Sequence, residues 1–173
     1  PDGKIDAADR IYLGSTDPKV IIGFGNMFEY KNFDLNIFFY GMFGQYVANS
    51  NRAKYGPSGC EYILQRQNYS KEVLERWTPD NPTNKFPSGF CSAYYGGDDW
   101  LLEKGSFVRC KNITLGYSFP HKWIHKVFSQ ARIYVDVENP FIITNYQGLD
   151  PEMDSKGGYP SQRTYSIGID ITF

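Results

Sequence analysis

The chain lacks any long hydrophobic run and any excess of charge. No stretch of about 18 apolar residues occurs, the length that a helix needs to cross a bilayer, so the sequence contains no transmembrane helix. The chain has 18 basic and 19 acidic side chains, so its formal net charge is −1. This balance excludes a strong electrostatic attraction for nucleic acid. The chain has only 3 cysteines, at no metal-ligand spacing. Cys60 and Cys91 flank one loop-like region, and the sequence leaves open whether they pair.

Catalytic motifs are also missing. The sequence has no Gly-rich phosphate loop, no Cys–His nucleophile pair and no convergent pair of carboxylates. His121 and His125 are four residues apart, as in zinc proteases, but Lys122 stands where such motifs need a glutamate. We therefore expect the protein not to be an enzyme.

Aromatic residues are abundant, with 14 tyrosines and 13 phenylalanines, and the segment 163–173 alternates strictly between apolar and small or polar residues. In a strand this pattern gives one apolar and one polar face. It continues for roughly the 9–11 residues that a tilted strand needs to cross a bilayer, whereas strands of soluble proteins average about 5–6. A terminal Phe173 suits the aromatic girdle of a membrane interface. The alternative is the last strand of a soluble β-sandwich. The apolar positions are Tyr165, Ile167, Ile169, Ile171 and Phe173.

Four further strands are expected from the same alternation, separated by connections that are in turn short and long. The pattern predicts antiparallel strands at about 20–30, from 33, at about 100–119 and from 131. Short periplasmic turns and long external loops are typical of outer-membrane barrels, so we expect an all-β transmembrane barrel with two long external loops, one of them at 44–99. Five strands cannot close a barrel, and we therefore expect more strands before Pro1.

Two local features refine this picture. Arg109 and Lys111 fall on the face of the third strand that is apolar lower down, which predicts that the strand leaves the hydrocarbon there. Within the loop 44–99, Ser70 is expected to cap a short amphipathic helix that ends near Trp77. The segment that begins at Asn139-Pro140 is expected to form the second long loop.

The first residues match the second half of a calcium loop. Asp2, Asp6 and Asp9 occupy the fifth, ninth and twelfth places, and Gly3 stands where the loop turns sharply. The first two ligand places would precede Pro1. We expect a Ca²⁺ site within an external segment 1–19, with a polar turn that binds no metal as the alternative.

Seven motifs stand out along the chain, at 2–14, 76–82, 102–109, 111–117, 148–152, 159–160 and 163–173. Together they resemble the SusC/RagA-like TonB-dependent transporters of the outer membrane of Gram-negative, Bacteroidetes-type bacteria. They span nearly the whole chain in the order of that family. The resemblance implies that the chain is the C-terminal part of a plugged barrel of about 22 strands, whose plug and TonB-box lie outside these residues.

The family resemblance implies that the protein imports oligosaccharides, with peptides as the second candidate substrate. It also implies two partners, the TonB complex and a SusD-like surface lipoprotein. Tyr94, Tyr95 and Trp100 are candidates for stacking on sugar rings near the external mouth, although they could equally pack one loop against another. The alternative function is that of a soluble β-rich glycan-binding module or a surface adhesin. A transporter needs several hundred residues before Pro1, whereas a module would begin within a few tens.

Overall fold

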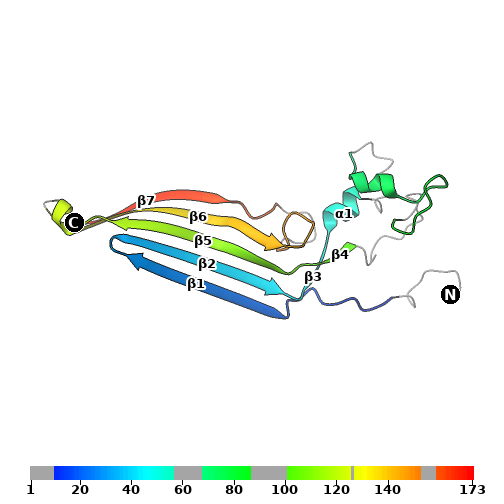
Figure 1. Cartoon of the computed structure of the whole chain (residues 1–173), viewed down its shortest axis with the longest axis horizontal. Coiled ribbons are helices and arrows are strands. Elements are labelled where there is room, and N and C mark those ends of the chain that lie inside the picture. Colours follow the sequence, from blue (N-terminus) through cyan, green and yellow to red (C-terminus); the bar gives the residue numbers. More distant parts are fainter. Residues whose placement is uncertain (1–9, 57–67, 87–100, 126, 153–158) are drawn as a thin grey trace.

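The computed structural model describes residues 10–56, 68–86, 101–125, 127–152 and 159–173. One curved antiparallel sheet dominates it, with the strand order β1-β2-β5-β6-β7 (Figure 1). Neighbours along the sheet are therefore also neighbours in chain order, apart from the excursion between β2 and β5. The strands are β1 (Val20–Tyr30), β2 (Phe33–Phe43), β5 (Phe107–Ser118), β6 (Gln130–Thr144) and β7 (Thr164–Thr172).

The smaller elements lie at the two ends of the sheet (Figure 1). At one end β3 (Tyr46–Ala48) pairs with β4 (Leu102–Lys104), and α1 (Ser50–Tyr55) and the 3₁₀ helix η2 (Lys71–Glu75) lie beyond them. At the other end, α3 (His121–Ile124) lies beside the C-terminus. Among the described residues, no helix is long and apolar enough to span a bilayer.

The predicted alternation is confirmed by the register, which aligns apolar side chains across all five strands. One such row runs through Phe28, Leu35, Leu115, Val135 and Ile167. Most of these side chains are exposed, up to 76% for Ile167, and in the described part of the chain no second sheet or helix covers them. A large exposed apolar face of this kind is typical of a surface that contacts a membrane or another protein.

The first hairpin follows the sequence prediction closely. Its first strand has the predicted bounds 20–30, and Lys31 adopts the left-handed φ of 55° that a two-residue turn needs. Asn32 then binds the neighbouring turn, since its Nδ2 donates to the Ser118 carbonyl at 2.6 Å.

The face predicted for Arg109 was wrong, because a β-bulge places the side chain on the other face. Phe38 pairs with Asn112 but Phe39 pairs with Cys110, so Lys111 is an extra residue in β5. An extra residue reverses the side-chain alternation beyond it. Arg109 therefore lies opposite Tyr40 on the polar face, where it is only 4% exposed, rather than on the lipid side.

Three boundaries also differ from the prediction. The third strand, expected at about 100–119, is divided into β4 and β5, and β4 pairs with β3 outside the main sheet. β6 continues through Asn139 and Pro140 to Thr144, with Asn139 at a left-handed φ of 48°, so the second loop begins later than expected. The helix capped by Ser70 exists but is a short 3₁₀ helix that ends at Glu75. Its Leu74 side chain is 78% exposed.

Candidate functional site

The site residues predicted from the sequence lie outside the described residues, so the calcium and sugar-stacking sites stay predictions. The question whether Cys60 pairs with Cys91 stays open for the same reason. Within the described ranges, no group of three potential metal ligands occurs. The residues concerned are Asp2, Asp6, Asp9, Tyr94, Tyr95 and Trp100.

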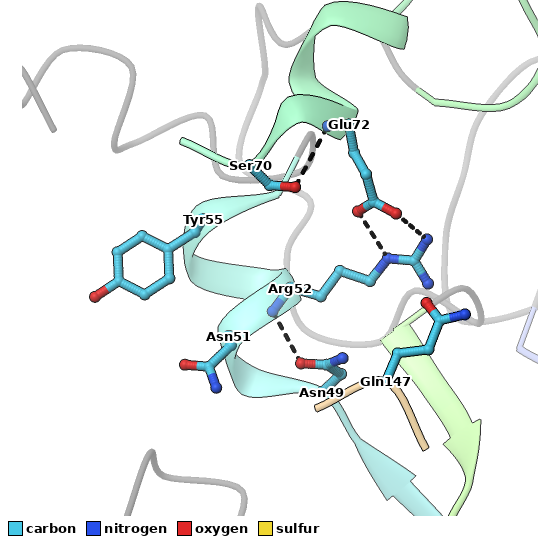
Figure 2. Close-up of a pocket in the computed structure, with 7 residues that line it drawn as sticks. All are labelled: Asn49, Asn51, Arg52, Tyr55, Ser70, Glu72 and Gln147. Atoms are coloured by element: carbon cyan, nitrogen blue, oxygen red, sulfur yellow. Dashed lines mark hydrogen bonds and ion pairs between the residues drawn. The ribbon is translucent and has the colours of Figure 1, made fainter. Parts of the chain in front are cut away.

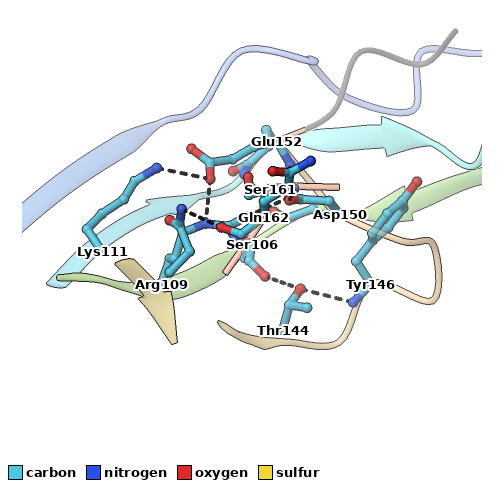
Figure 3. Close-up of polar contacts among 12 residues, drawn as sticks. Ser106, Arg109, Lys111, Thr144, Tyr146, Asp150, Glu152, Ser161 and Gln162 are labelled. Atoms are coloured by element: carbon cyan, nitrogen blue, oxygen red, sulfur yellow. Dashed lines mark hydrogen bonds and ion pairs between the residues drawn. The ribbon is translucent and has the colours of Figure 1, made fainter. Parts of the chain in front are cut away.

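A cluster of charges fastens the loop after β6 to the external end of β5 (Figure 3). Arg109 donates from Nη2 to Asp150 Oδ1 and from Nε to Glu152 Oε2, each at 2.6 Å. The Lys111 Nζ lies 3.6 Å from the same Glu152 carboxylate. Because the bulge directs Arg109 to the polar face, the loop closes over the inside of the sheet.

Asp150 is the centre of this cluster and is almost fully buried. Burial alone would raise the pKa of its carboxyl, but the backbone N–H groups of Ser161 and Glu152 donate to it and Arg109 supplies a positive charge. Together these lower the pKa of Asp150 below its ordinary value, so the carboxylate is charged at neutral pH. The loop is thus held through a buried, fully ionised pair.

Glu103 of β4 joins the same loop to the helix α1. Its Oε1 accepts from Asn49 Nδ2 at 2.9 Å, and its Oε2 accepts from the backbone N–H of Gln147 at 2.8 Å. Arg52 lies 3.6 Å from Glu103 and also donates from Nε and Nη2 to Glu72, at 3.2 and 2.9 Å. One chain of ion pairs and hydrogen bonds therefore holds β4, α1, η2 and the loop after β6 as one external platform.

The platform carries an open hollow of about 350 Å³ (Figure 2). The described residues that line it contribute amides, a hydroxyl, a phenol and one ion pair, and none of them has an aliphatic side chain. Such groups supply several hydrogen-bond donors and acceptors at once, which suits a neutral, hydroxyl-rich ligand. The lining residues are Asn49, Asn51, Arg52, Tyr55, Ser70, Glu72 and Gln147.

A second polar network lies on the inner face of the sheet, toward the end with the short turns. Arg132 of β6 donates from Nε and Nη2 to Asp34 of β2 at 3.0 and 2.6 Å, and from Nη1 to Asp170 of β7 at 3.2 Å. Further up, Asp136 accepts from Asn112 and from Thr114. The inner face is therefore lined with charged and polar groups, as expected of the wall of a water-filled or plugged barrel.

The sequence carried some signal for these residues. The motif 148–152 contains Asp150 and Glu152, but the family resemblance by itself implies no role for either side chain. Arg132 and Asp170 fall on polar positions of alternating strands, so a register prediction would have paired them. Nothing in the sequence pointed to Asn49 or Gln147 as pocket residues, because they come together only through the fold.

No family model matches the chain. The chain is, however, similar over 99% of its length to curated TonB-dependent receptors. It is 31% identical to TonB-dependent receptor SusC of Bacteroides thetaiotaomicron and covers 17% of that protein. It is 29% identical to TonB-dependent receptor P3 of Formosa agariphila and covers 18% of it. The chain thus spans less than a fifth of the length of these relatives.

Solved structures give the same result. The sheet superimposes on a structure of the RagAB peptide transporter with a TM-score of 0.80 and 30% identity, over 98% of this chain and 19% of that one. A largely exposed apolar face, a polar inner face and this similarity agree with one another. The chain belongs to the SusC/RagA-like TonB-dependent receptors of the Bacteroidetes outer membrane, and its sheet is a section of their antiparallel transmembrane barrel.

Proposed function

We propose that the full-length protein imports an oligosaccharide across the outer membrane, driven by the TonB complex and assisted by a SusD-like surface lipoprotein. The observation that carries this proposal is the similarity to SusC over 99% of the chain. The five-stranded sheet with its exposed apolar face supports it, because this face has the properties of a lipid-contacting wall.

The external hollow favours a glycan over a peptide as the transported molecule. Two amides on its wall, those of Asn51 and Gln147, belong to side chains with no hydrogen bond to another described residue, and Tyr55 adds an aromatic surface. Amides and aromatic rings together suit sugar hydroxyls and sugar faces. A peptide is the second candidate, because the RagAB structures are described as those of a peptide importer and are about as similar in sequence, at 28–30% identity.

The other two functions considered for the chain have less support. A soluble glycan-binding module would expose the apolar row of the sheet to water, which favours aggregation rather than solubility. For an enzyme, the relatives offer no support, since they are named as receptors.

The loop 44–99 provides the test. Deleting residues 60–95 from the full-length protein removes η2 with Glu72 but keeps β3, α1 and the Glu103 contacts. We expect the barrel to assemble in the outer membrane while capture of the lipoprotein or uptake of a labelled oligosaccharide falls. Normal capture of the lipoprotein and normal uptake of the oligosaccharide by this variant would show that the deleted part of the loop is needed for neither.

A narrower variant separates the two candidate substrates. Replacing Asn51 and Gln147 together by alanine removes the two amides and leaves the ion pairs of the platform intact. Uptake of labelled oligosaccharides is expected to fall while the amount of assembled protein stays the same. If labelled peptides alone compete for uptake and the double variant takes them up normally, the glycan proposal is wrong.

A further inference from the structure

The connection between β5 and β6 has a composition unlike the rest of the chain. Residues 119–130 contain two lysines, two histidines and no acidic residue, whereas the whole chain has a net charge of −1. Between these polar residues stand Trp123, Ile124, Val127 and two phenylalanines. A basic segment with interleaved aromatic and aliphatic residues is typical of a membrane surface.

Both ends of this connection leave the sheet on its apolar side. Phe119 makes an edge contact with Tyr117, with ring centroids 5.4 Å apart, and Phe128 makes a similar contact with Phe173, also at 5.4 Å. By the strand alternation, Tyr117 and Phe173 belong to the exposed apolar face. Figure 1 places α3 and the C-terminus together at this end of the sheet. The connection therefore lies where the lipid-facing wall ends.

The side chains of α3 suit the boundary between acyl chains and headgroups. Trp123 is 66% exposed, and Lys122 beside it is exposed as well. The rings of His121 and His125 stack with centroids 6.0 Å apart, so the two imidazoles lie together on one side of the turn. Indole groups prefer the interfacial layer, while lysine and imidazole N–H groups can donate to a phosphate.

The neighbouring turn adds a further cation at the same level. Lys31 places its Nζ 5.2 Å from the ring centroid of Tyr30, which stands at the end of the apolar face. The two turns are joined directly, since Asn32 Nδ2 donates to the Ser118 carbonyl at 2.6 Å and the Ser118 N–H donates to the Asn32 carbonyl at 2.8 Å. Lys31 and Lys122 are thus carried by two connections that are fixed to each other.

We propose that these two turns form a binding surface for the headgroup of an anionic phospholipid in the periplasmic leaflet. Lys122 and Lys31 face the phosphate, and Trp123 lies among the first carbons of the acyl chains. The aromatic contacts with the lipid-facing wall favour a lipid over free phosphate, because they hold the cations at the membrane surface. The surface acts to fix the depth of the barrel in the bilayer, and it is independent of which substrate the protein transports.

Native mass spectrometry of the full-length protein, supplied with equal amounts of phosphatidylglycerol and phosphatidylethanolamine in detergent, tests this surface. The wild-type protein is expected to retain phosphatidylglycerol preferentially. Each cation near a membrane surface contributes about fivefold in affinity, so Lys122→Gln should lower this preference roughly fivefold and Lys122→Glu should lower it further. Heat-dependent migration on gels checks that each variant is folded.

Lys71→Glu is the matched control, because Lys71 is an exposed lysine of η2 at the opposite end of the sheet. It should leave lipid retention unchanged. Equal retention of the two lipids by the wild-type protein would overturn the proposal, as would an unchanged preference in Lys122→Glu. Competition by inorganic phosphate in place of lipid would show an anion site without a lipid role and would also overturn it.

Discussion

Arg132 and Asp34 are 98 residues apart in the sequence, yet their side chains form a two-point ion pair across the strand between them. The guanidinium reaches over β5 at Gly116, the position that pairs with Asp34 in the register. The pair therefore joins β2 to β6 on the inner face, in addition to the backbone hydrogen bonds that each makes with β5. It exists only because the intervening strand has no side chain at that point.

Replacing Gly116 by alanine tests this dependence on an empty position. A Cβ at Gly116 would overlap with the Asp34 carboxylate and the Arg132 guanidinium, which would have to move apart. We expect the variant to unfold at a lower temperature in detergent, with a loss of about 1–3 kcal/mol. Gly25→Ala is the control, because its Cβ would meet Phe38 at an ordinary 3.4 Å. Equal stability of the two variants would contradict the role given to Gly116.

The two carboxylates that bind Arg132 are expected to differ in their contribution. Asp34 accepts two hydrogen bonds and its side chain is 27% exposed, whereas Asp170 accepts one at 3.2 Å and its side chain is 62% exposed. Asp34→Asn should therefore lower the free energy of unfolding by about 1–2 kcal/mol. Asp170→Asn should lower it by less than about 0.5 kcal/mol, since solvent screens an exposed pair. Chemical denaturation of the two variants in parallel gives the comparison, and a larger loss for Asp170→Asn would contradict it.

The sequence predicted the parts of the fold that repeat with a period of two. The strands at 20–30 and 163–173, the short turns and the apolar face all follow from alternation, because each residue's face is set locally. The bulge at Lys111 could not be predicted, since its extra residue is defined only by the register with a partner strand. The external platform could not be predicted for a similar reason. Glu103, Asn49 and Gln147 are distant in the sequence and meet only in the folded chain, so no local sequence pattern indicates their contacts.

A cation on the apolar face is expected to destabilise the barrel far more than one on the polar face. Ile169 lies mid-strand opposite Ile133 and is exposed toward the lipid side. Ile169→Arg should cost about 2–4 kcal/mol of barrel stability if the residue lies near the bilayer midplane. Ser166→Arg, on the inner face of the same strand, is the control and should cost less than a third of this. Unfolding of both variants from lipid vesicles measures the difference, and equal costs would contradict the assignment of the two faces.

Calcium binding near the start of the chain remains a prediction. Asp2, Asp6 and Asp9 have the spacing of the second half of a calcium loop, in which carboxylates supply hard oxygen ligands. The full-length protein is expected to contain Ca²⁺ by elemental analysis and to lose thermal stability when the ion is chelated. Asp6→Ala should reduce both the calcium content and the effect of chelation. A protein without calcium, together with unchanged stability of Asp6→Ala, would show that this segment is a polar turn.

The buried pair of Arg109 and Asp150 is expected to control how often the loop after β6 opens. Both side chains are almost fully buried, so removal of one partner leaves the other charge without its ion-pair partner and shielded from solvent. Arg109→Met should therefore lower the free energy of loop opening by about 3–5 kcal/mol. Lys111→Met is the control, because Lys111 is partly exposed and lies 3.6 Å from its carboxylate, and it should cost less than about 1 kcal/mol. Hydrogen exchange of the Ser161 amide, which donates to Asp150, measures the opening directly.

Hydrogen exchange of the Ser161 amide also measures how loop opening depends on pH. Because the pKa of Asp150 is lowered in the folded protein, its carboxylate stabilises the closed loop at pH values above its ordinary value of 3.8. This stabilisation is lost as the pH falls through the lower folded pKa, when the carboxyl is protonated. After correction for intrinsic exchange rates, protection of the Ser161 amide should be constant between about pH 5 and 7 and should fall below about pH 3.5. In Asp150→Asn, the Ser161 amide should be less protected at neutral pH, and its protection should not fall further in acid. If protection in this variant fell in acid by the same amount as in the wild type, the titrating group would not be Asp150.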